Sequence, residues 1–145
     1  MTLYLDTSSL VKLYINEPGT DAVRKLVDEA TIVVTSGLAY PETRAALARR
    51  RRERVLLPGA FALAKRRFEE DWPKYLAADV TSSICREAGE LAERYRLRGY
   101  DAVHLASFAE VARRAGTRQT RFSSFDDRLN QAARAVTRRL ARRHK

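Results

Sequence analysis

Four acidic residues of this chain stand where the acids of an α/β protein can act together. Asp6 directly follows a short apolar, β-prone run, and Asp126 follows a weaker run of the same kind near the C-terminus. Glu42 lies one to two turns into the helical segment that follows the β-prone run at residues 31–35. Asp101 lies at the start of the helical segment that precedes the β-prone run at residues 119–123. Open α/β sheets bind ligands beyond the carboxyl ends of their strands, so these four are our candidate catalytic and metal-binding residues.

Carboxylates that converge at one edge of a sheet need a counter-charge. Like charges at close range repel each other and raise each other's pKa, and no basic residue adjoins any of the four acids in the sequence. A hard divalent cation relieves this repulsion, and Mg²⁺ and Mn²⁺ prefer oxygen ligands. Such an ion can activate water and stabilise the transition state of a phosphoryl reaction. We therefore expect Mg²⁺ as the cofactor, with Mn²⁺ as the alternative.

Each acid also has a purely structural interpretation. Asp6 can cap the helix that follows it, and Asp126 or Asp127 can cap the last helix. Glu42 and Asp101 suit the first turns of their helices, where the helix dipole favours negative charge. The shared position of the acids at one sheet edge favours the functional interpretation of the set.

The chain alternates β-prone runs with longer helical segments. Strands are expected at residues 2–5, 31–35, 77–81 and 119–123, the second with the apolar, β-branched character of a strand buried on both faces. Helices are expected at residues 7–14, 20–29, 37–52, 58–75, 82–96, 100–115 and 126–136. Thr7 or Ser8 is expected to cap the first helix, and Ser82 or Ser83 the fifth. This alternation predicts an α/β fold with a parallel sheet covered on both faces.

The length and composition narrow the class of protein. The 145 residues suit one domain, 1–145, whose basic tail at about 134–145 either continues the last helix or frays. Lys and Arg number 28 against 18 Asp and Glu, a net charge of +10, which indicates a nucleic-acid partner or simply a basic surface. No apolar run is long enough to span a membrane, and the N-terminus is unlike a secretory signal, so a cytoplasmic protein is expected. Cys85 is the only cysteine and is expected in the core.

Several basic residues are candidate RNA backbone contacts, although solvated helix charges explain them equally well. Lys12 and Arg44 follow the first two acids at helical spacings, and Arg49 and Arg50 belong to an arginine run. The run and the basic tail can both grip RNA phosphates, which supply salt-dependent affinity without sequence selectivity.

Two other features have mainly structural interpretations. His104 follows Asp101 by three residues, and we expect a hydrogen-bonded core histidine there rather than a general base. Phe61, Phe68 and Trp72 form an aromatic stripe that we expect in the core or in a dimer interface.

Four stretches of the sequence resemble, in order, the four motifs of PIN domains, and specifically of VapC-type toxins. They are LDTSSLVKLY at 5–14, YPETRAAL at 40–47, LRGYDAVHLA at 97–106 and FSSFDDRL at 122–129. Together they cover the chain from end to end. The third stretch is the most specific of them.

The resemblance implies a three-layer α/β/α sandwich with a mostly parallel central sheet. It implies a metal-dependent endoribonuclease, the toxin of a toxin–antitoxin pair, which hydrolyses RNA phosphodiester bonds with a metal-activated water and leaves a 5′-phosphate. It further implies a VapB-like antitoxin as partner and a homodimer.

The matching catalytic acids are Asp6, Glu42, Asp101 and Asp126. Asp126 is chosen over Asp127 because it follows Ser-Phe, as in the family pattern, which leaves Asp127 as the expected helix cap. Thr7 and Ser124 match positions whose small hydroxyls orient carboxylates or water.

Two other classes of function stay open from the sequence. A non-catalytic nucleic-acid-binding module predicts salt-sensitive RNA binding without cleavage and without a divalent cation. Another carboxylate-based phosphoryl-handling α/β protein predicts a stable aspartyl phosphate. The acids argue against the first, because carboxylates that face phosphate repel it unless a metal lies between them.

Overall fold

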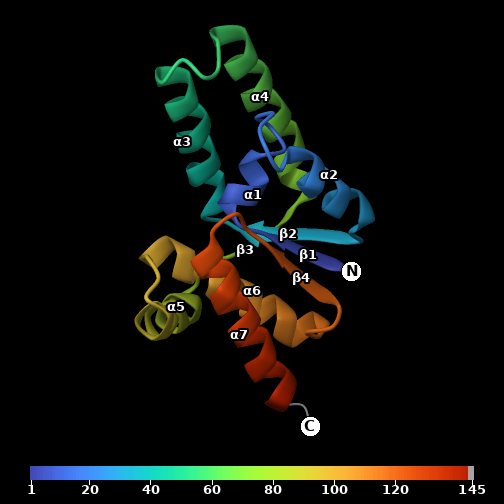
Figure 1. Ribbon diagram of the computed structural model, residues 1–145, viewed down its shortest axis with the longest axis vertical. Helices are drawn as coiled ribbons and strands as arrows, with labels where there is room; N and C mark the ends of the chain where they lie inside the picture. Colours follow the sequence, from blue (N-terminus) through green and yellow to red (C-terminus); the bar gives the residue numbers. More distant parts are fainter. Residues whose placement is uncertain (144–145) are drawn as a thin grey trace.

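The computed structural model describes residues 1–143, which alternate strands and helices as the sequence predicts (Figure 1). Four strands are present: β1 (Thr2–Leu5), β2 (Ile32–Ser36), β3 (Leu76–Ala78) and β4 (Thr120–Ser123). Seven α-helices and one 3₁₀ turn connect them: α1 (Thr7–Val11), α2 (Thr20–Glu29), α3 (Ala39–Arg52), α4 (Pro58–Asp71), η1 (Trp72–Lys74), α5 (Ser82–Tyr95), α6 (Gly99–Ala115) and α7 (Asp127–Arg143).

The four strands form one parallel sheet in the order β3-β2-β1-β4. The chain runs outward from β1 to β3 on one side and then returns to place β4 on the other side of β1. The carboxyl ends of β1 and β4 therefore lie next to each other, with Leu5 paired to Ser123. This is the point of the sheet from which the chain connections lead off in opposite directions. Such a switch point is where open α/β sheets bind ligands, and Asp6 is the first residue after it.

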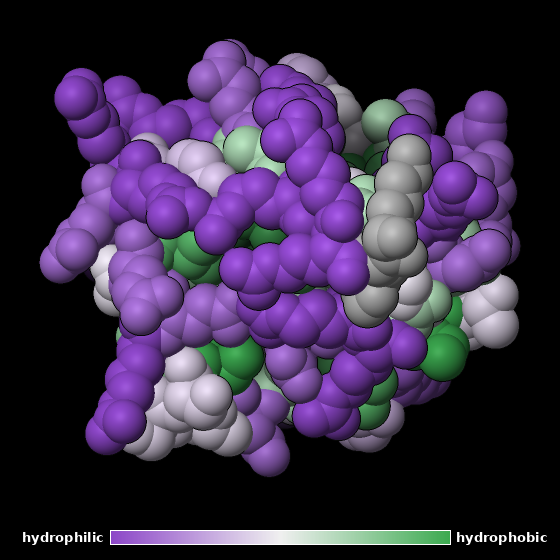
Figure 2. Space-filling view, turned by 90° about the horizontal axis from the view of Figure 1, so that it is seen from below, coloured by the Kyte–Doolittle hydropathy of each residue, from purple (hydrophilic) through white to green (hydrophobic). Residues whose placement is uncertain are grey.

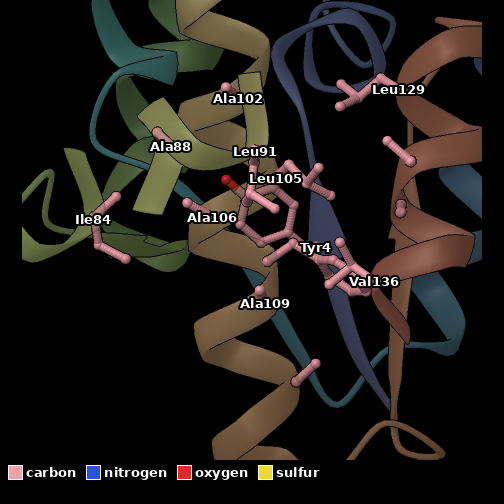
Figure 3. Close-up of a cluster of buried hydrophobic side chains, with 14 of the residues drawn as sticks. Tyr4, Ile84, Ala88, Leu91, Ala102, Leu105, Ala106, Ala109, Leu129 and Val136 are labelled. Carbon is pink, nitrogen blue, oxygen red and sulfur yellow. The ribbon is translucent and has the colours of Figure 1, made fainter. Parts of the chain in front are cut away.

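Helices cover both faces of the sheet, which confirms the three-layer α/β/α arrangement. In Figure 1, α1 to α4 lie above the sheet and α5 to α7 below it. Side chains of a strand alternate between faces, and β1 accordingly sends Leu3 and Leu5 to one core and Tyr4 to the other. Figure 3 shows Tyr4 among side chains of α5, α6 and α7, including Leu105 and Val136.

The structure selects one of the candidate caps of the first helix and places the cap of the fifth one residue earlier than predicted. Asp6, rather than Thr7 or Ser8, is the N-cap of α1, because its carboxylate accepts the Ser9 backbone N–H. Thr81 caps α5 in the same way through the Ile84 N–H, in place of Ser82 or Ser83. In both cases the cap is the last extended residue before the helix, where a short polar side chain reaches the first free N–H groups.

Two predicted helices end earlier than expected. The first stops at Val11 instead of Tyr14. The helix predicted to reach residue 75 ends at Asp71 and passes into the 3₁₀ turn that contains Pro73. Proline has no N–H to donate to the preceding turn, so the helix cannot continue through it.

The predicted aromatic stripe is core within this chain. Phe68 is fully buried and packs at ring-centroid distances of 5.3 Å from Tyr14, 5.6 Å from Tyr40 and 5.6 Å from Trp72. The expectation for Cys85 is wrong, because it lies on the exposed side of α5, next to the inward-facing Ile84.

The predicted basic tail continues the last helix rather than fraying, as far as residue 143, and its final two residues lie outside the described part. The apolar stripe of α7, which includes Val136 and Leu140, packs on the core and explains why the helix runs on. Strand β2 is less buried than predicted, since Ile32 at its start is 47% exposed. Across residues 1–143, every helix is too short or too polar to cross a membrane.

Candidate active site at the carboxyl edge of the sheet

Asp6 is the most buried of the four predicted acids, with 3% of its surface exposed. Its Oδ1 accepts hydrogen bonds from the Ser9 backbone N–H at 3.0 Å and the Ser8 hydroxyl at 2.7 Å, and its Oδ2 accepts one from the Ser124 hydroxyl at 2.6 Å. Burial raises the pKa of Asp6, and these three donors partly offset that rise. Capping and a functional role are thus compatible, because the capping carboxylate still lies at the switch point of the sheet.

Ser124 joins Asp6 to Asp126. The Ser124 hydroxyl donates to Asp6, and its oxygen accepts the backbone N–H of Asp126 at 3.0 Å. Asp126 Oδ1 in turn accepts the Leu129 N–H at 2.8 Å, which makes Asp126 the capping side chain of α7. The expectation that Asp127 fills this role is therefore wrong, since Asp127 is already the first helical residue and is exposed.

Glu42 belongs to a partly buried chain of hydrogen-bonded polar groups. Its Oε1 accepts a hydrogen bond from the Thr7 hydroxyl at 2.8 Å and lies 2.9 Å from His104 Nε2. His104 Nδ1 lies 3.0 Å from the hydroxyl of Tyr4, and both of these side chains are almost completely buried. His104 is thus a hydrogen-bonded core histidine, as predicted, and it also holds Glu42 in one orientation. Thr7 contacts a candidate acid, in keeping with its predicted orienting role.

Asp101 and Asp126 are bridged by Arg98, which was not among the predicted site residues. Arg98 Nε donates to Asp101 Oδ2 at 3.1 Å, and Arg98 Nη2 lies 3.7 Å from Asp126 Oδ2. Burial raises the pKa of Asp101, an effect that the Arg98 guanidinium opposes and that the nearby Asp126 carboxylate reinforces. The signal for Arg98 was present in the third motif stretch, where it precedes Asp101 by one helical turn.

The four acids therefore share one edge of the sheet, but each is turned toward a donor of the protein. Ser8, Ser9 and Ser124 serve Asp6, while Thr7 and His104 serve Glu42. In residues 1–143, no three acidic, histidine or cysteine side chains converge tightly enough to hold a metal ion in this arrangement. The donor set consists of carboxylate and hydroxyl oxygens, which fits Mg²⁺ or Mn²⁺ rather than a metal that prefers nitrogen or sulfur.

The four cations proposed as RNA contacts each have an acidic partner inside the protein. Lys12 and Arg50 both pair with Glu17, at 3.0 Å and 3.1 Å. Arg44 pairs with Glu69 at 2.7 Å, and Arg49 pairs with Glu53 at 2.8 Å; these four contacts neutralise much of the charge that the sequence offers to phosphate. Lys12 also lies 4.4 Å from the ring centre of Phe125, so its ammonium group is largely enclosed.

The arrangement places fixed carboxylates in a partly dry site. Asp6 and Glu42 have their oxygens held by hydroxyl, amide and imidazole groups, so each carboxylate has one defined orientation in the absence of a ligand. Asp101 and Asp126 are held by an arginine whose side chain is 65% exposed. A divalent cation shared by these acids would require their side chains to turn away from these donors, and it would then polarise a water molecule against a phosphodiester.

The sequence matches the model of a known family and the sequences of three ribonucleases. The model of the PIN domain matches residues 3–135. Ribonuclease VapC45 and Ribonuclease VapC49, from two strains of Mycobacterium tuberculosis, are each 37% identical over 139 residues, which cover 96% of this chain and 94% of theirs. Ribonuclease VapC46 of Mycobacterium tuberculosis is 33% identical over 134 residues, or 92% of each chain.

A solved structure shares the fold. The crystal structure of Mycobacterium tuberculosis VapC20, a sarcin–ricin loop cleaving toxin, superimposes with a TM-score of 0.66 over 90% of this chain and 94% of that one. Its sequence identity is 21%, so this likeness concerns the fold alone. The family is shown instead by the match over residues 3–135 and by the relatives above 30% identity. This chain belongs to the PIN-domain family, among the VapC ribonucleases.

Proposed function

We propose that this protein is the toxin of a toxin–antitoxin pair and a metal-dependent endoribonuclease. The observation that carries the proposal is the buried Asp6 carboxylate at the switch point of the sheet, with Glu42, Asp101 and Asp126 at the same edge. The ribonuclease relatives, 37% identical over 96% of the chain, support the same reaction. We assign Asp6, Glu42, Asp101 and Asp126 as the catalytic, metal-holding acids.

The residues around these acids prepare them for that role. Ser124 and Ser8 hold both oxygens of Asp6, and Thr7 and His104 hold one oxygen of Glu42. A bound divalent cation supplies polarisation of a water molecule and neutralisation of the charge that develops on the phosphodiester. Arg98 must release Asp101 and Asp126 for them to take part, because a guanidinium and a cation compete for the same carboxylate oxygens.

Divalent cations are expected to stabilise the fold at neutral pH. Burial raises the pKa of Asp6 and Asp101, so in the metal-free protein these groups cost stability as the pH rises from their unfolded pKa through the folded one. At ten times its Kd a cation contributes about 1.4 kcal/mol, which raises Tm by roughly 4–6 °C. The gain should shrink on acidification, since protons compete for the same oxygens.

Differential scanning fluorimetry of EDTA-treated protein, with Mg²⁺ or Mn²⁺ added at constant ionic strength, checks this. A variant that carries both Asp6→Asn and Asp101→Asn is the control and should show almost no gain. An equal rise in Tm for wild type and variant would place the cation elsewhere on the protein.

RNA cleavage is the direct test of the proposed function. Purified protein is incubated with total RNA in Mg²⁺, in Mn²⁺ and in EDTA, and the new RNA ends are sequenced. We expect cleavage with either metal, none in EDTA, and products that carry a 5′-phosphate. RNA binding without cleavage would support a non-catalytic module, and a stable aspartyl phosphate after incubation with a phosphoryl donor would support a different phosphoryl chemistry.

The partners follow from the same proposal. We propose RNA as the substrate, a VapB-like antitoxin as the inhibitor, a homodimer as the assembly and the cytoplasm as the location. Expression with and without a VapB-like antitoxin, followed by sequencing of RNA 5′ ends, tests the first two, because growth should stop and new RNA ends should form only in its absence. Analytical ultracentrifugation of the purified protein tests the assembly.

A further inference from the structure

A groove between β4 and α7 contains arginines that no acid neutralises. It has a volume of about 350 Å³ and is lined by Arg121 from β4 and by Arg134 and Arg138 from α7. All three side chains are exposed, and none of them forms an ion pair with another residue of the described part. No described acidic residue lines the groove. Its charge is therefore available to an external anion.

The electrostatic setting of this groove differs from that of the cations near the start of the chain. Lys12, Arg44, Arg49 and Arg50 are each within 3.1 Å of a carboxylate oxygen, so a phosphate must displace an internal partner to bind them. In the groove, the walls include Phe108 and Phe122, and charge of a single sign lies over apolar surface. Clefts of this kind focus the field and concentrate ligands of opposite charge.

One end of the groove lies close to the candidate active site. Asn130 lines it, and its Nδ2 donates to the backbone oxygen of Ser124 at 2.8 Å. Ser124 in turn donates from its hydroxyl to Asp6 at 2.6 Å. One end of the groove is thus two hydrogen bonds away from the most buried candidate acid.

The other end leads away from the acids along the helix. Arg134 and Arg138 follow Asn130 by four and eight residues, which places them about 6 and 12 Å further along α7. Figure 1 shows α7 running from the carboxyl edge of the sheet toward the lower end of the molecule, whereas β4 ends at that edge. Seen from that end, the surface consists mostly of hydrophilic side chains with small apolar areas between them (Figure 2). Cations spaced by one helical turn suit successive phosphates of an extended strand.

We propose that this groove is the track of the RNA substrate, in which Arg121, Arg134 and Arg138 bind backbone phosphates on one side of the cleavage point. The inference rests on the proposed function and adds a path for the strand. Contacts to phosphate supply affinity and register without reading bases, so sequence selectivity comes from elsewhere.

Binding to a short, labelled, single-stranded RNA tests the track. Fluorescence anisotropy in EDTA, where no cleavage is expected, gives Kd over a range of salt concentrations for wild type and for a triple variant with Arg121→Gln, Arg134→Gln and Arg138→Gln. Each lost phosphate contact should lower the salt slope by about 0.7, so the triple variant should lose about 2 units of slope. Its affinity at low salt should fall by about tenfold or more.

A second triple variant is the matched control. Arg24→Gln, Arg66→Gln and Arg67→Gln remove the same number of exposed charges from α2 and α4, on the other side of the sheet, and we expect the salt slope to stay within experimental error of wild type. If both variants lost the same amount of salt slope, the effect would come from net charge alone, and the proposed track would be wrong. A loss of slope in the control variant only would also contradict the proposal. If the groove variant changed its sedimentation coefficient but bound RNA as wild type does, the groove would be an interface between copies of this chain. That result would also contradict the proposal.

The outcome is separable from that of the proposed function. Cleavage by wild type and its loss in Asp6→Asn decide whether the protein is a ribonuclease. The slopes of the two arginine variants decide where the strand lies. A protein that cleaves RNA but whose groove variant binds RNA as wild type does would refute only the track.

Discussion

Replacing Asp6 by asparagine should abolish most RNA cleavage while leaving the fold intact. Asparagine is as good an N-cap as aspartate, so the hydrogen bond to the Ser9 N–H and the start of α1 are expected to persist. What disappears is the negative charge at the switch point of the sheet. We expect the cleavage rate in Mg²⁺ to fall by about 10²- to 10³-fold, the loss typical of a group that stabilises the transition state directly.

The stability of the Asp6→Asn variant separates this effect from unfolding. Because burial raises the pKa of Asp6, the ionised carboxylate of the metal-free wild type is unfavourable at neutral pH. The neutral variant should therefore unfold in EDTA at a Tm equal to or above that of wild type. As the pH rises above about 4 it should lose less stability than wild type, because only Asp101 then contributes to the loss.

Asp28→Asn is the matched control for the same charge change. Asp28 is exposed on α2, and we expect its variant to cleave RNA as wild type does. Cleavage by Asp6→Asn at the wild-type rate would remove Asp6 from the catalytic set. A greatly lowered Tm would mean instead that its role is structural.

Replacing His104 by leucine should reduce cleavage by about 10- to 100-fold, the usual effect of removing a residue that orients a metal-holding carboxylate. His104 bonds to Glu42 at 2.9 Å on one ring nitrogen and to Tyr4 at 3.0 Å on the other. Leucine fills the buried space but leaves the Tyr4 hydroxyl without a partner. Chemical denaturation should therefore show a loss of about 1–3 kcal/mol in unfolding free energy.

A second substitution distinguishes orientation of Glu42 from stability. Tyr4→Phe removes the unpaired hydroxyl, so the double variant Tyr4→Phe/His104→Leu should regain much of the lost stability while its cleavage stays low. Tyr4→Phe alone keeps the bond between His104 and Glu42 and should cleave RNA within a few-fold of wild type. If cleavage returned together with stability in the double variant, His104 would be a packing residue only.

The sequence by itself determined the fold class and the candidate acids. Alternation of β-prone and helical segments predicts a parallel sheet covered on both faces, and parallel strands place their carboxyl ends at one edge. Acids that follow strand ends, such as Asp6 and Asp126, therefore share that edge whatever the details of packing. Local rules were also enough to predict polar caps for α1, α5 and α7, although the cap of α5 lies one residue earlier than predicted.

The tertiary structure alone decided which groups are partners. Pairing between Glu42 and His104 spans 62 positions, and pairing between Asp6 and Ser124 spans 118, so no local pattern encodes either contact. Whether a cation has an acidic partner within the protein also depends on contacts between distant positions of the sequence. Arg50 of α3 forms an ion pair with Glu17, which lies in the loop before α2. Arg121 and Arg134 form no ion pair with an acidic residue in the part of the chain that the structure describes. Net charge is a sum over the sequence, but its availability to RNA depends on which neighbours folding brings within a few ångströms.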